Sequence, residues 1–324
     1  MAELSVRRVV TGFDGTGAEV FTSDGPAKNT VAAGPVGVSE VLWLDRADFA
    51  IGADPDRNGA GFPLEPPAGG LSVRVIRMPG IPEGTDPDDT WLRVDTEEPG
   101  RPGMHATDTL DLMVVLEGSV VMGLDDGSER TIGAGEYVVQ RGTLHRWRPA
   151  DAGGWTYMVA MLRPLDERDD DPVPEGLTAA TVGDSSVRRV VTGEPVTDGG
   201  AAKALGGGSS TLTDLWLTGG ALRSAVQGGD LGAPWVLVPP PGGAGFRQVE
   251  LAPDMPLVDE LWHTTPTIDV DVVLSGRVRL DLPEGVSTEL GVGDVVVQRG
   301  TNHRWVPVGD ETFRMATVMF TPLA

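Results

Sequence analysis

The chain of 324 residues contains two copies of one sequence unit, and this duplication limits its fold more than any other feature. The octapeptide SVRRVVTG occurs at residues 5–12 and again at residues 186–193. From His105 to Leu165 the sequence aligns without gaps to His263–Leu323, with about 26 of 61 positions identical. A repeat of this length predicts two similar domains, each large enough to bury its own core.

The segment between the copies, DERDDDPVPEG at residues 166–176, is charged and rich in proline, as is typical of an exposed linker. Two turn-rich acidic insertions, residues 53–62 and 84–103, lengthen the first copy and predict surface loops or a lid. We therefore predict an N-terminal domain at residues 1–165, a linker at 166–185 and a C-terminal domain at 186–324.

Short β-rich segments such as LSVRVIRM and LDLMVVLEGSVVMGL follow one another in each copy, separated by Gly, Asp-Gly or Pro turns. The 45 glycines and 26 prolines suit many short strands, and no segment of convincing length shows a helical period. The pattern predicts an all-β chain, with an antiparallel sandwich or barrel in each half.

The charge and the cysteine content exclude several classes of function. A formal charge of −23 makes nucleic acid and anionic membranes improbable partners, because both would be repelled. The absence of cysteine excludes disulfides, thiolate nucleophiles and thiolate metal sites. The N-terminus lacks the pattern of a secretory signal, and no apolar run approaches the length of a membrane span. We expect a cytoplasmic protein with a small-molecule or protein partner.

The four histidines of the chain form two matched pairs in the repeat alignment, His105 with His145 and His263 with His303. In HATDTLD, which begins at His105, every second residue is polar, and HTTPTID repeats the pattern from His263. Side chains alternate between the two faces of a strand, so each run places four polar groups on one face and apolar groups on the other. The polar face therefore lines something other than a dry core, and a filled cavity is the natural candidate.

These motifs resemble those of the cupin superfamily, and the whole chain resembles a bicupin. A cupin begins its first motif with Gly and His-x-His, followed by a glutamate and, seven residues later, a glycine. Here Gly118 and Gly276 fit the closing glycine, with an aspartate seven residues before each. The second motif, from glycine to a last histidine, fits GEYVVQRGTLH and GDVVVQRGTNH, which end at His145 and His303. The resemblance implies two tandem jelly-roll β-barrels.

The resemblance also implies a divalent metal ion in each barrel, held by three histidines and a glutamate. This chain has threonine in place of the second histidine and aspartate in place of the glutamate, and a threonine hydroxyl is a poor ligand. The remaining two histidines and one carboxylate could still hold Fe, Mn or Zn with open positions, as in the facial triad of non-haem oxygenases. The candidate metal ligands are His105, Asp111 and His145 in the first barrel, and His263, Asp269 and His303 in the second.

The alternative is that no metal is bound and that these groups only bond a ligand or transfer protons. His145 or His303 could then serve as general base beside an aspartate, because imidazole titrates near neutrality. Asp271, which replaces Met113 on the histidine face, favours the second barrel as the more active one. The candidate catalytic residues are therefore His145, His303, Asp111, Asp269 and Asp271.

Further residues are candidates for the pocket wall. Trp147 and Trp305 share the face of the histidines, although core packing explains them equally well. Arg74 and Arg247 could bind a carboxylate or enolate if they point inward, but a surface position on a sheet edge is the simpler expectation. The Gln-Arg pairs at 140–141 and 298–299 are expected to fix their loop. The predicted pocket residues are Thr107, Thr109, Thr265, Thr267, Trp147, Trp305, Arg74 and Arg247.

Three functions remain open from the sequence. The first is a cupin-type lyase, isomerase or cyclase that acts on a small carbonyl or aromatic, polyketide-like metabolite in secondary metabolism. The second is a non-haem iron dioxygenase, and the third is a bicupin that binds a small molecule without catalysis, since a fold alone does not define a reaction. We also expect the two barrels to pack together as an intrachain pseudo-dimer, with a homodimer as a further possibility.

Overall fold

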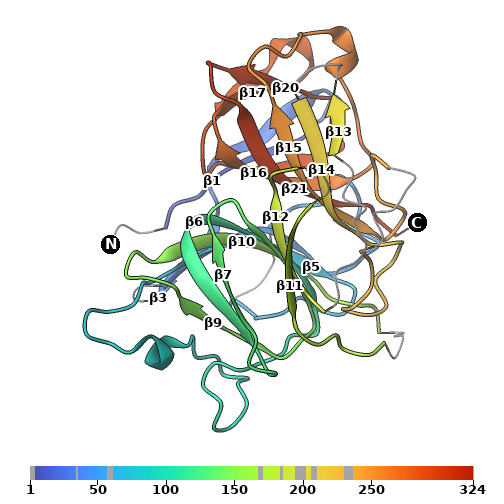
Figure 1. Ribbon diagram of the computed structural model, residues 1–324. Helices are drawn as coiled ribbons and strands as arrows, with labels where there is room; N and C mark the ends of the chain where they lie inside the picture. The colour runs from blue at the N-terminus through green and yellow to red at the C-terminus, as the bar shows by residue number, and fades with distance from the viewer. Residues whose placement is uncertain are drawn as a thin grey trace.

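The computed structural model describes residues 4–33, 36–56, 61–166, 171–182, 185–193, 202–205, 210–229 and 236–323. These residues form strands joined by turns and three short 3-10 helices, η1 (Pro87–Thr90), η2 (Asp259–Leu261) and η3 (Pro283–Gly285). No described helix is long and apolar enough to cross a membrane. The prediction of an all-β chain with two tandem jelly-roll barrels is confirmed (Figure 1).

One barrel holds most of the second copy and consists of an eight-stranded and a three-stranded sheet. The large sheet runs, in spatial order, through β13 (Ala202–Leu205), β14 (Ser210–Leu217), β15 (Ala244–Leu251), β21 (Phe313–Phe320), β16 (Ile268–Ser275), β19 (Val295–Arg299), β1 (Arg7–Phe13) and β2 (Glu19–Pro26). The small sheet consists of β18 (Ser287–Leu290), β17 (Arg277–Asp281) and β20 (Arg304–Val308).

The other barrel repeats this plan with most of the first copy. Its large sheet runs through β11 (Leu177–Thr181), β12 (Arg188–Thr192), β8 (Tyr137–Arg141), β6 (Leu110–Leu124), β10 (Trp155–Leu162), β5 (Leu71–Met78), β4 (Val36–Leu44) and β3 (Asn29–Ala33). The second half of β6 leaves this sheet and pairs with β7 (Glu129–Gly133) and β9 (His145–Pro149).

The bend in β6 depends on the glycine that closes the first sequence motif. Gly118 has a φ of 74°, and a Cβ atom there would lie 2.1 Å from the carbonyl oxygen of Gly154. Gly276, its repeat equivalent, has a φ of 70° between β16 and β17. Only glycine adopts this left-handed conformation without strain so close to another backbone, which explains why both copies have it.

Each copy contributes its first strand to the barrel of the other copy. β1, from the first SVRRVVTG, pairs in parallel with β19 of the second copy. β12, from the second SVRRVVTG, pairs in the same way with β8 of the first copy. Figure 1 accordingly shows the blue β1 among the orange and red strands. The predicted domain boundaries at 165 and 185 remain a prediction. Sheet pairing crosses both boundaries, and β11 lies within the segment predicted as the linker.

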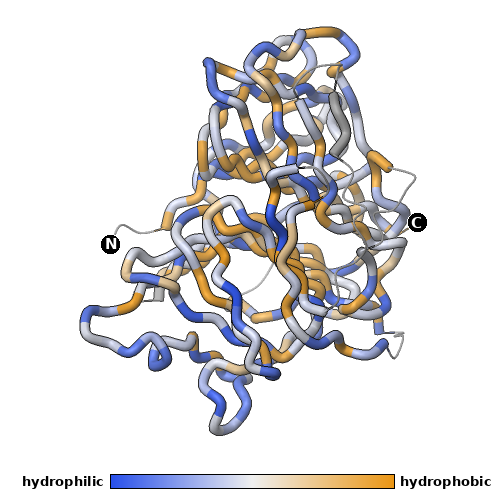
Figure 2. Tube along the Cα trace, viewed as in Figure 1, coloured by the Kyte–Doolittle hydropathy of each residue, from blue (hydrophilic) through white to orange (hydrophobic). Residues whose placement is uncertain are grey.

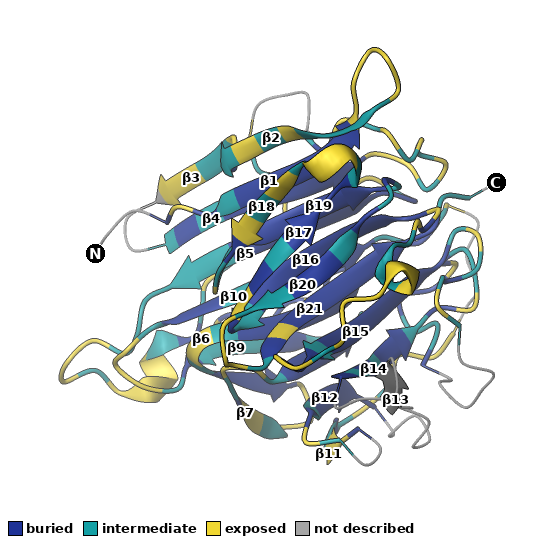
Figure 3. Ribbon diagram, turned by 90° about the horizontal axis from the view of Figure 1, so that it is seen from above, coloured by how far each residue is buried: buried dark blue, intermediate teal, exposed yellow. Residues whose placement is uncertain are grey.

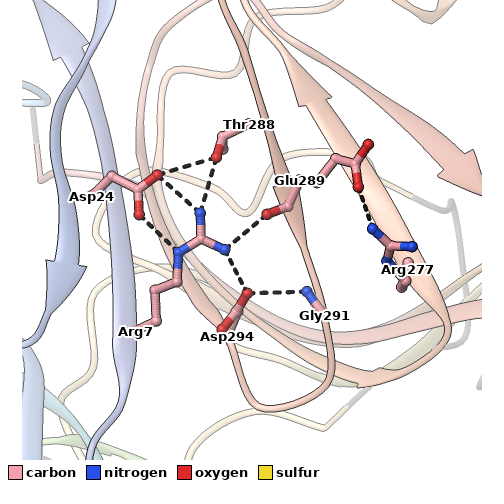
Figure 4. Close-up of polar contacts among 7 residues, drawn as sticks. All are labelled: Arg7, Asp24, Arg277, Thr288, Glu289, Gly291 and Asp294. Atoms are coloured by element: carbon pink, nitrogen blue, oxygen red, sulfur yellow. Dashed lines mark hydrogen bonds and ion pairs between the residues drawn. The ribbon is translucent and has the colours of Figure 1, made fainter.

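An arginine of the exchanged strand fastens it to its host barrel. Arg7 donates hydrogen bonds to both carboxylate oxygens of Asp24 at 2.8 and 2.9 Å, to the Glu289 carbonyl at 2.8 Å, to Asp294 at 2.8 Å and to Thr288 at 3.0 Å (Figure 4). Its repeat equivalent, Arg188, bonds in the same manner to the carbonyl of Thr131 and to Glu136.

A second arginine reaches the exchanged strand from the host side. Arg299, from QRGT, donates to the carbonyl oxygen of Thr11 at 2.7 Å, and its backbone N–H donates to the Thr11 hydroxyl at 3.0 Å. A Cβ atom at Gly12 would lie 2.5 Å from the Arg299 guanidinium, so the last glycine of SVRRVVTG makes room for the arginine of QRGT. The two repeated motifs therefore occur together because they contact each other across the copies.

The two large sheets share one apolar core. The residues of β6 and β16 that point away from the histidine face belong to it, among them Leu110, Leu112, Val270 and Val272, all with no exposed surface. Exchanged residues such as Val10 lie in the same core. Figures 2 and 3 show apolar, buried strands at the centre and polar, exposed loops at the periphery. Burying this shared face is the main apolar contribution to holding the halves together.

Candidate functional site

The two histidines of each half lie side by side, as the sequence predicted. Backbone hydrogen bonds of 2.8 and 2.9 Å join His105 to His145 in both directions, and bonds of 3.0 Å join His263 to His303. The ring centroids are 4.5 Å apart in the first pair and 4.2 Å apart in the second. The two backbone hydrogen bonds of each antiparallel bridge thus bring together side chains that are 40 positions apart in the sequence.

In all four histidines, Nδ1 lies against the backbone carbonyl of the residue two positions earlier. The distances are 2.8 Å from His105 to Gly103, 2.9 Å from His145 to Thr143, 2.9 Å from His263 to Leu261 and 3.0 Å from His303 to Thr301. These contacts hold Nδ1 at the barrel wall. Nε2 is therefore the ring nitrogen of each histidine that remains for a ligand.

His145 and His303, the more buried histidine of each pair, favour the neutral form at physiological pH. Burial lowers the pKa of His145 and of His303 to about 3, and the neighbouring imidazole of His105 or His263 adds to the effect. A buried imidazolium would lose its hydration without gaining a counter-charge. Both rings therefore act as neutral hydrogen-bonding groups.

A cavity of about 410 Å³ lies inside the C-terminal barrel and reaches its mouth. His263, His303, Asp269 and Asp271 line it together with Arg247. Its remaining wall is mainly apolar, formed by Leu212, Val249, Leu251, Met255, Trp305, Met315 and Met319, with Leu237, Val258 and Leu261 among the others. A volume of this size and a wall of this kind suit a small organic ligand.

Two buried carboxyl groups stand next to each other on β16 in this cavity. Asp271 accepts a hydrogen bond from the Thr317 hydroxyl at 2.7 Å, and Asp269 accepts one from Thr265 at 3.3 Å. The Asp269 Oδ1 atom is buried without a hydrogen bond to any residue that the structure describes. Burial raises the pKa of Asp269 to about 6, and burial together with the Asp269 charge raises the pKa of Asp271. Two such groups in one pocket disfavour the ionisation of both at once.

Arg247 is buried and lines the cavity, so the expectation of a surface position is wrong. It is 3% exposed, lies 3.1 Å from the Asp214 carboxylate and donates to the Leu237 carbonyl at 3.0 Å. Arg74, its repeat equivalent, is also buried, at 4% exposure. It lies 3.2 Å from Glu40. Both arginines lie on the inner face of their sheets, where an acidic partner compensates each charge.

The carboxyl group of the N-terminal barrel that corresponds to Asp269 belongs to Asp111. Asp111 accepts a hydrogen bond of 2.5 Å from Thr109, and burial raises the pKa of Asp111 to about 7. Thr107 is buried on the same face. Tyr157 is a pocket candidate that sequence reasoning missed, although the alternation in WTYMVAML places it on the inner face of β10. Its ring stacks on Trp155 at 4.4 Å, and burial with the charge of Asp111 raises its pKa.

The predicted metal ligands do not form a three-ligand set in either barrel. Among the described residues, no three histidine, aspartate or glutamate side chains are placed to hold one metal ion. The histidines of each half are adjacent, but Asp111 and Asp269 bond to threonines instead of joining them. The residues present therefore do not fit the metal geometry that the resemblance implies.

The remaining predicted residues occupy identifiable places. Trp305 lines the cavity and meets the His303 ring edge-on at 5.9 Å, and Trp147 meets His145 at 5.7 Å. Thr265 lines the cavity, whereas Thr267 is fully buried beside it. Gln140 fixes the turn between β8 and β9, because it donates to the Thr143 carbonyl and accepts from the N–H of Gly142.

Sequence reasoning missed the residues that form the mouth and one wall of the cavity. Leu237, Met255 and Val258 come from loops and Leu261 from η2, none of which carries a motif, so no pattern identified them. The wall residues of β21, Met315, Thr317 and Met319, alternate along FRMATVMF and could have been found by period-two reasoning.

Comparison with known proteins gives partial matches. No protein-family model matches the chain. The oryzines biosynthesis cluster protein J of Aspergillus oryzae is 43% identical over 65 residues, which are 20% of this chain and 35% of that protein. The phomopsin biosynthesis cluster proteins C' and D of Diaporthe leptostromiformis are each 48% identical over 65 residues, 20% of this chain and 33% of theirs. The chain thus spans about a third of the length of these curated relatives.

Solved structures resemble the chain over most of its length at low sequence identity. AerE from Microcystis aeruginosa has a TM-score of 0.47 and 9% identity, with 90% of this chain and 95% of that chain covered. A cupin 2 conserved barrel domain protein from Leptotrichia buccalis has a TM-score of 0.46 and 8% identity, with 90% and 92% covered. An oxalate decarboxylase from Lactobacillus farciminis has a TM-score of 0.44 and 11% identity, with 91% and 84% covered.

Proposed function

We propose that the chain is a cytoplasmic bicupin enzyme of secondary metabolism that transforms a small carbonyl or aromatic metabolite by proton transfer in its C-terminal barrel. The chemistry is that of a lyase, isomerase or cyclase. The observation that carries the proposal is the cavity of about 410 Å³ in which two carboxyl groups and two imidazoles meet an apolar wall. The names of the curated relatives support a biosynthetic role, because all three belong to biosynthesis clusters.

The proposed reaction divides the work among the chain's own residues. The apolar wall holds the body of the substrate and excludes water from the reacting atoms. An ionised Asp269 accepts a proton from a carbon or hydroxyl next to a carbonyl, and a protonated Asp271 donates one. Arg247, paired with Asp214, is a charged group in the otherwise mainly apolar wall of the cavity. The packed halves act as an intrachain pseudo-dimer that keeps each barrel closed.

Deuterium exchange tests the proton transfer directly. The purified protein would be incubated in D₂O with 2-hydroxyacetophenone, and mass spectrometry would measure deuterium at the carbon next to the carbonyl. We expect exchange above the background rate, reduced about 100-fold or more in Asp271→Asn protein, because general acid–base catalysis contributes about that much. The matched control is Asp111→Asn, which leaves the C-terminal cavity intact and is expected to retain the wild-type rate.

Other outcomes of this experiment would contradict the proposal. Ketone that binds but shows only background exchange would favour a binding protein. Oxygen consumption that requires ferrous iron, with an increase in product mass, would favour the dioxygenase. Equal loss of exchange in Asp111→Asn protein would move the reaction out of the C-terminal barrel.

A further inference from the structure

The two histidines of the C-terminal cavity have different partners at Nδ1. For His263 the polar partner is the Leu261 carbonyl at 2.9 Å, which only accepts, so Nδ1 carries the proton and Nε2 carries the lone pair. For His303 the amide nitrogen of Gln298 contacts Nδ1 in addition to the Thr301 carbonyl at 3.0 Å. The state of the His303 ring therefore depends on the orientation of the Gln298 amide.

A residue from the other copy sets that orientation. The Thr11 hydroxyl on β1 accepts the backbone N–H of Arg299 at 3.0 Å, so its own hydrogen is available to donate. It donates to Oε1 of Gln298 at 3.2 Å. The N–H of Thr301 also donates to Oε1, at 3.3 Å. Two donors thus face the amide oxygen, and the NH₂ group of Gln298 must lie on the other side.

The NH₂ group then has two hydrogens and two acceptors. One hydrogen goes to the Thr301 carbonyl, 2.7 Å from the amide nitrogen, and the other points at Nδ1 of His303. A proton on Nδ1 could point at the Thr301 carbonyl, 3.0 Å away, but it would oppose the N–H of Gln298, which lies closer to Nδ1. An unprotonated Nδ1 instead accepts from Gln298, whose second hydrogen serves the Thr301 carbonyl. This balance favours the tautomer with the proton on Nε2.

We propose that Gln298, held by Thr11 of the exchanged strand, fixes His303 with its proton on Nε2, so that His303 donates and His263 accepts a hydrogen bond in the cavity. Gln298 and Thr11 are positioning residues, because they act on the ligand only through His303. The first strand of one copy thereby defines the polarity of the site in the other.

This polarity defines the class of ligand and in that respect rests on the proposed function. In addition to Arg247 and Asp271, the cavity presents an N–H donor at His303 and, beside it, acceptors at His263 Nε2 and at Asp269 Oδ1. A complementary ligand carries a carbonyl oxygen next to a hydroxyl group, as in a hydroxy ketone or the enol of a dicarbonyl compound. The apolar wall accommodates the rest of an aromatic or aliphatic skeleton.

Nitrogen-15 NMR of the imidazoles tests the tautomer without any substrate. The chain has four histidines, so each ring is assigned by single His→Gln variants. We expect His263 to show an unprotonated Nε2 and His303 an unprotonated Nδ1. A protonated Nδ1 in His303 of the wild-type protein would overturn the proposal, whatever the enzyme activity.

Three variants separate positioning from general stability. In Gln298→Glu protein the carboxylate accepts from Nδ1, so the proton of His303 should move to Nδ1. Thr11→Val should give a mixture of the two His303 tautomers, and Thr11→Ser should restore the wild-type spectrum. The matched control is Gln140→Glu, which contacts His145 and should leave the His303 signals unchanged. Unchanged His303 signals in folded Gln298→Glu protein would also overturn the proposal.

A pair of probes tests the ligand class apart from turnover. Binding of 2-hydroxyacetophenone is compared with that of 2-methoxyacetophenone, which lacks the hydrogen to donate. We expect the hydroxy ketone to bind about tenfold more tightly in the wild-type protein, because only its hydroxyl group donates to His263 or Asp269. In Gln298→Glu protein both ketones should bind more weakly, because the carbonyl oxygen that they share loses the His303 donor. Equal affinities would refute the ligand class while leaving the tautomer result unaffected.

Discussion

The two barrels share a backbone plan and a histidine pair but differ in what fills the interior. In the C-terminal barrel Asp271 and Met315 line an open cavity, whereas Met113 and Tyr157 occupy the equivalent positions in the N-terminal barrel. The residues that hold the frame, namely the histidine turn and the exchanged strand, are the same in both copies. The difference teaches that the duplicated frame tolerates divergent contents, so function must be sought in the interior positions that differ.

The loops near the two barrel mouths differ in how far their apolar side chains are buried. In the N-terminal barrel Trp91 is buried, and the guanidinium of Arg146 lies 3.8 Å from the centre of its ring. At the mouth of the C-terminal cavity Leu237 and Val258 are 42% and 43% exposed. Exposed apolar side chains around a cavity are typical of a ligand entrance. The insertion at residues 84–103, which contains Trp91, therefore packs onto the N-terminal barrel.

Exchanging the interior residue that differs most should produce the largest effect. Asp271→Met introduces the residue of the N-terminal barrel and removes one member of the carboxyl pair. We expect α-deuterium exchange of the hydroxy ketone to fall about 100-fold or more, since a general acid or base is lost. The reverse variant, Met113→Asp, should leave the rate unchanged. A Met113→Asp protein that alters exchange as strongly would show that the barrels are not functionally distinct.

The buried Asp111 makes the stability of the N-terminal barrel depend on pH. The unfolded carboxyl group loses its proton near pH 4, whereas burial raises the folded pKa to about 7. At Asp111 the folded state therefore binds more protons in this interval, so the contribution of this group to stability is highest below pH 4 and falls as the pH rises to 7. The loss amounts to at most about 4 kcal/mol for this one group.

Urea unfolding at pH 4.5 and pH 7.5 measures this dependence. Asp111→Asn protein should lose less stability between the two pH values than the wild type, because asparagine does not titrate. Asp269 and Asp271 act in the same direction in the C-terminal barrel, so part of the slope should remain. Equal changes in stability in the wild-type and Asp111→Asn proteins would contradict a neutral, buried Asp111.

The QRGT arginines allow the two strand exchanges to be compared. The Arg299 side chain donates to the carbonyl oxygens of Thr11, Gly52 and Ala53 and to a threonine hydroxyl. Among the described residues, the Arg141 side chain donates to the carbonyls of Val226 and Thr192. Removing Arg299 leaves more buried acceptors without a donor. We expect Arg299→Met to lower the free energy of unfolding by about 3 kcal/mol and Arg141→Met by about 1–2 kcal/mol, measured in urea. An equal cost would mean that both strands are held equally well.

The sequence predicted the frame of the molecule better than its contents. Period-two alternation and the repeat identified both histidine pairs, the carboxylates and the inward face of each strand, because these depend on local geometry. The exchange of β1 and β12 was not predictable, since SVRRVVTG specifies a strand but not which sheet edge it joins. The burial of Arg74 and Arg247 was missed because their partners, Glu40 and Asp214, lie on another strand and occupy no shared motif.

The ion pairs at the ends of the exchanged strands should contribute least, and they complete the comparison. Arg7 is about a third exposed and contacts two carboxylates, and Arg188 is similarly exposed and contacts Glu136. Solvent screens both, and partly exposed pairs contribute about 0.2–1 kcal/mol. A double-mutant cycle of Arg7→Met with Asp294→Asn should give a coupling energy of about 1 kcal/mol. The cycle of Arg188→Met with Glu136→Gln should give about half of that, because Arg7 has the additional fixed acceptors shown in Figure 4. Both coupling energies should fall in about 1 M salt, because salt screens exposed charges. A coupling energy that salt leaves unchanged would show that buried hydrogen bonds, and not ion pairs, hold the exchanged strands.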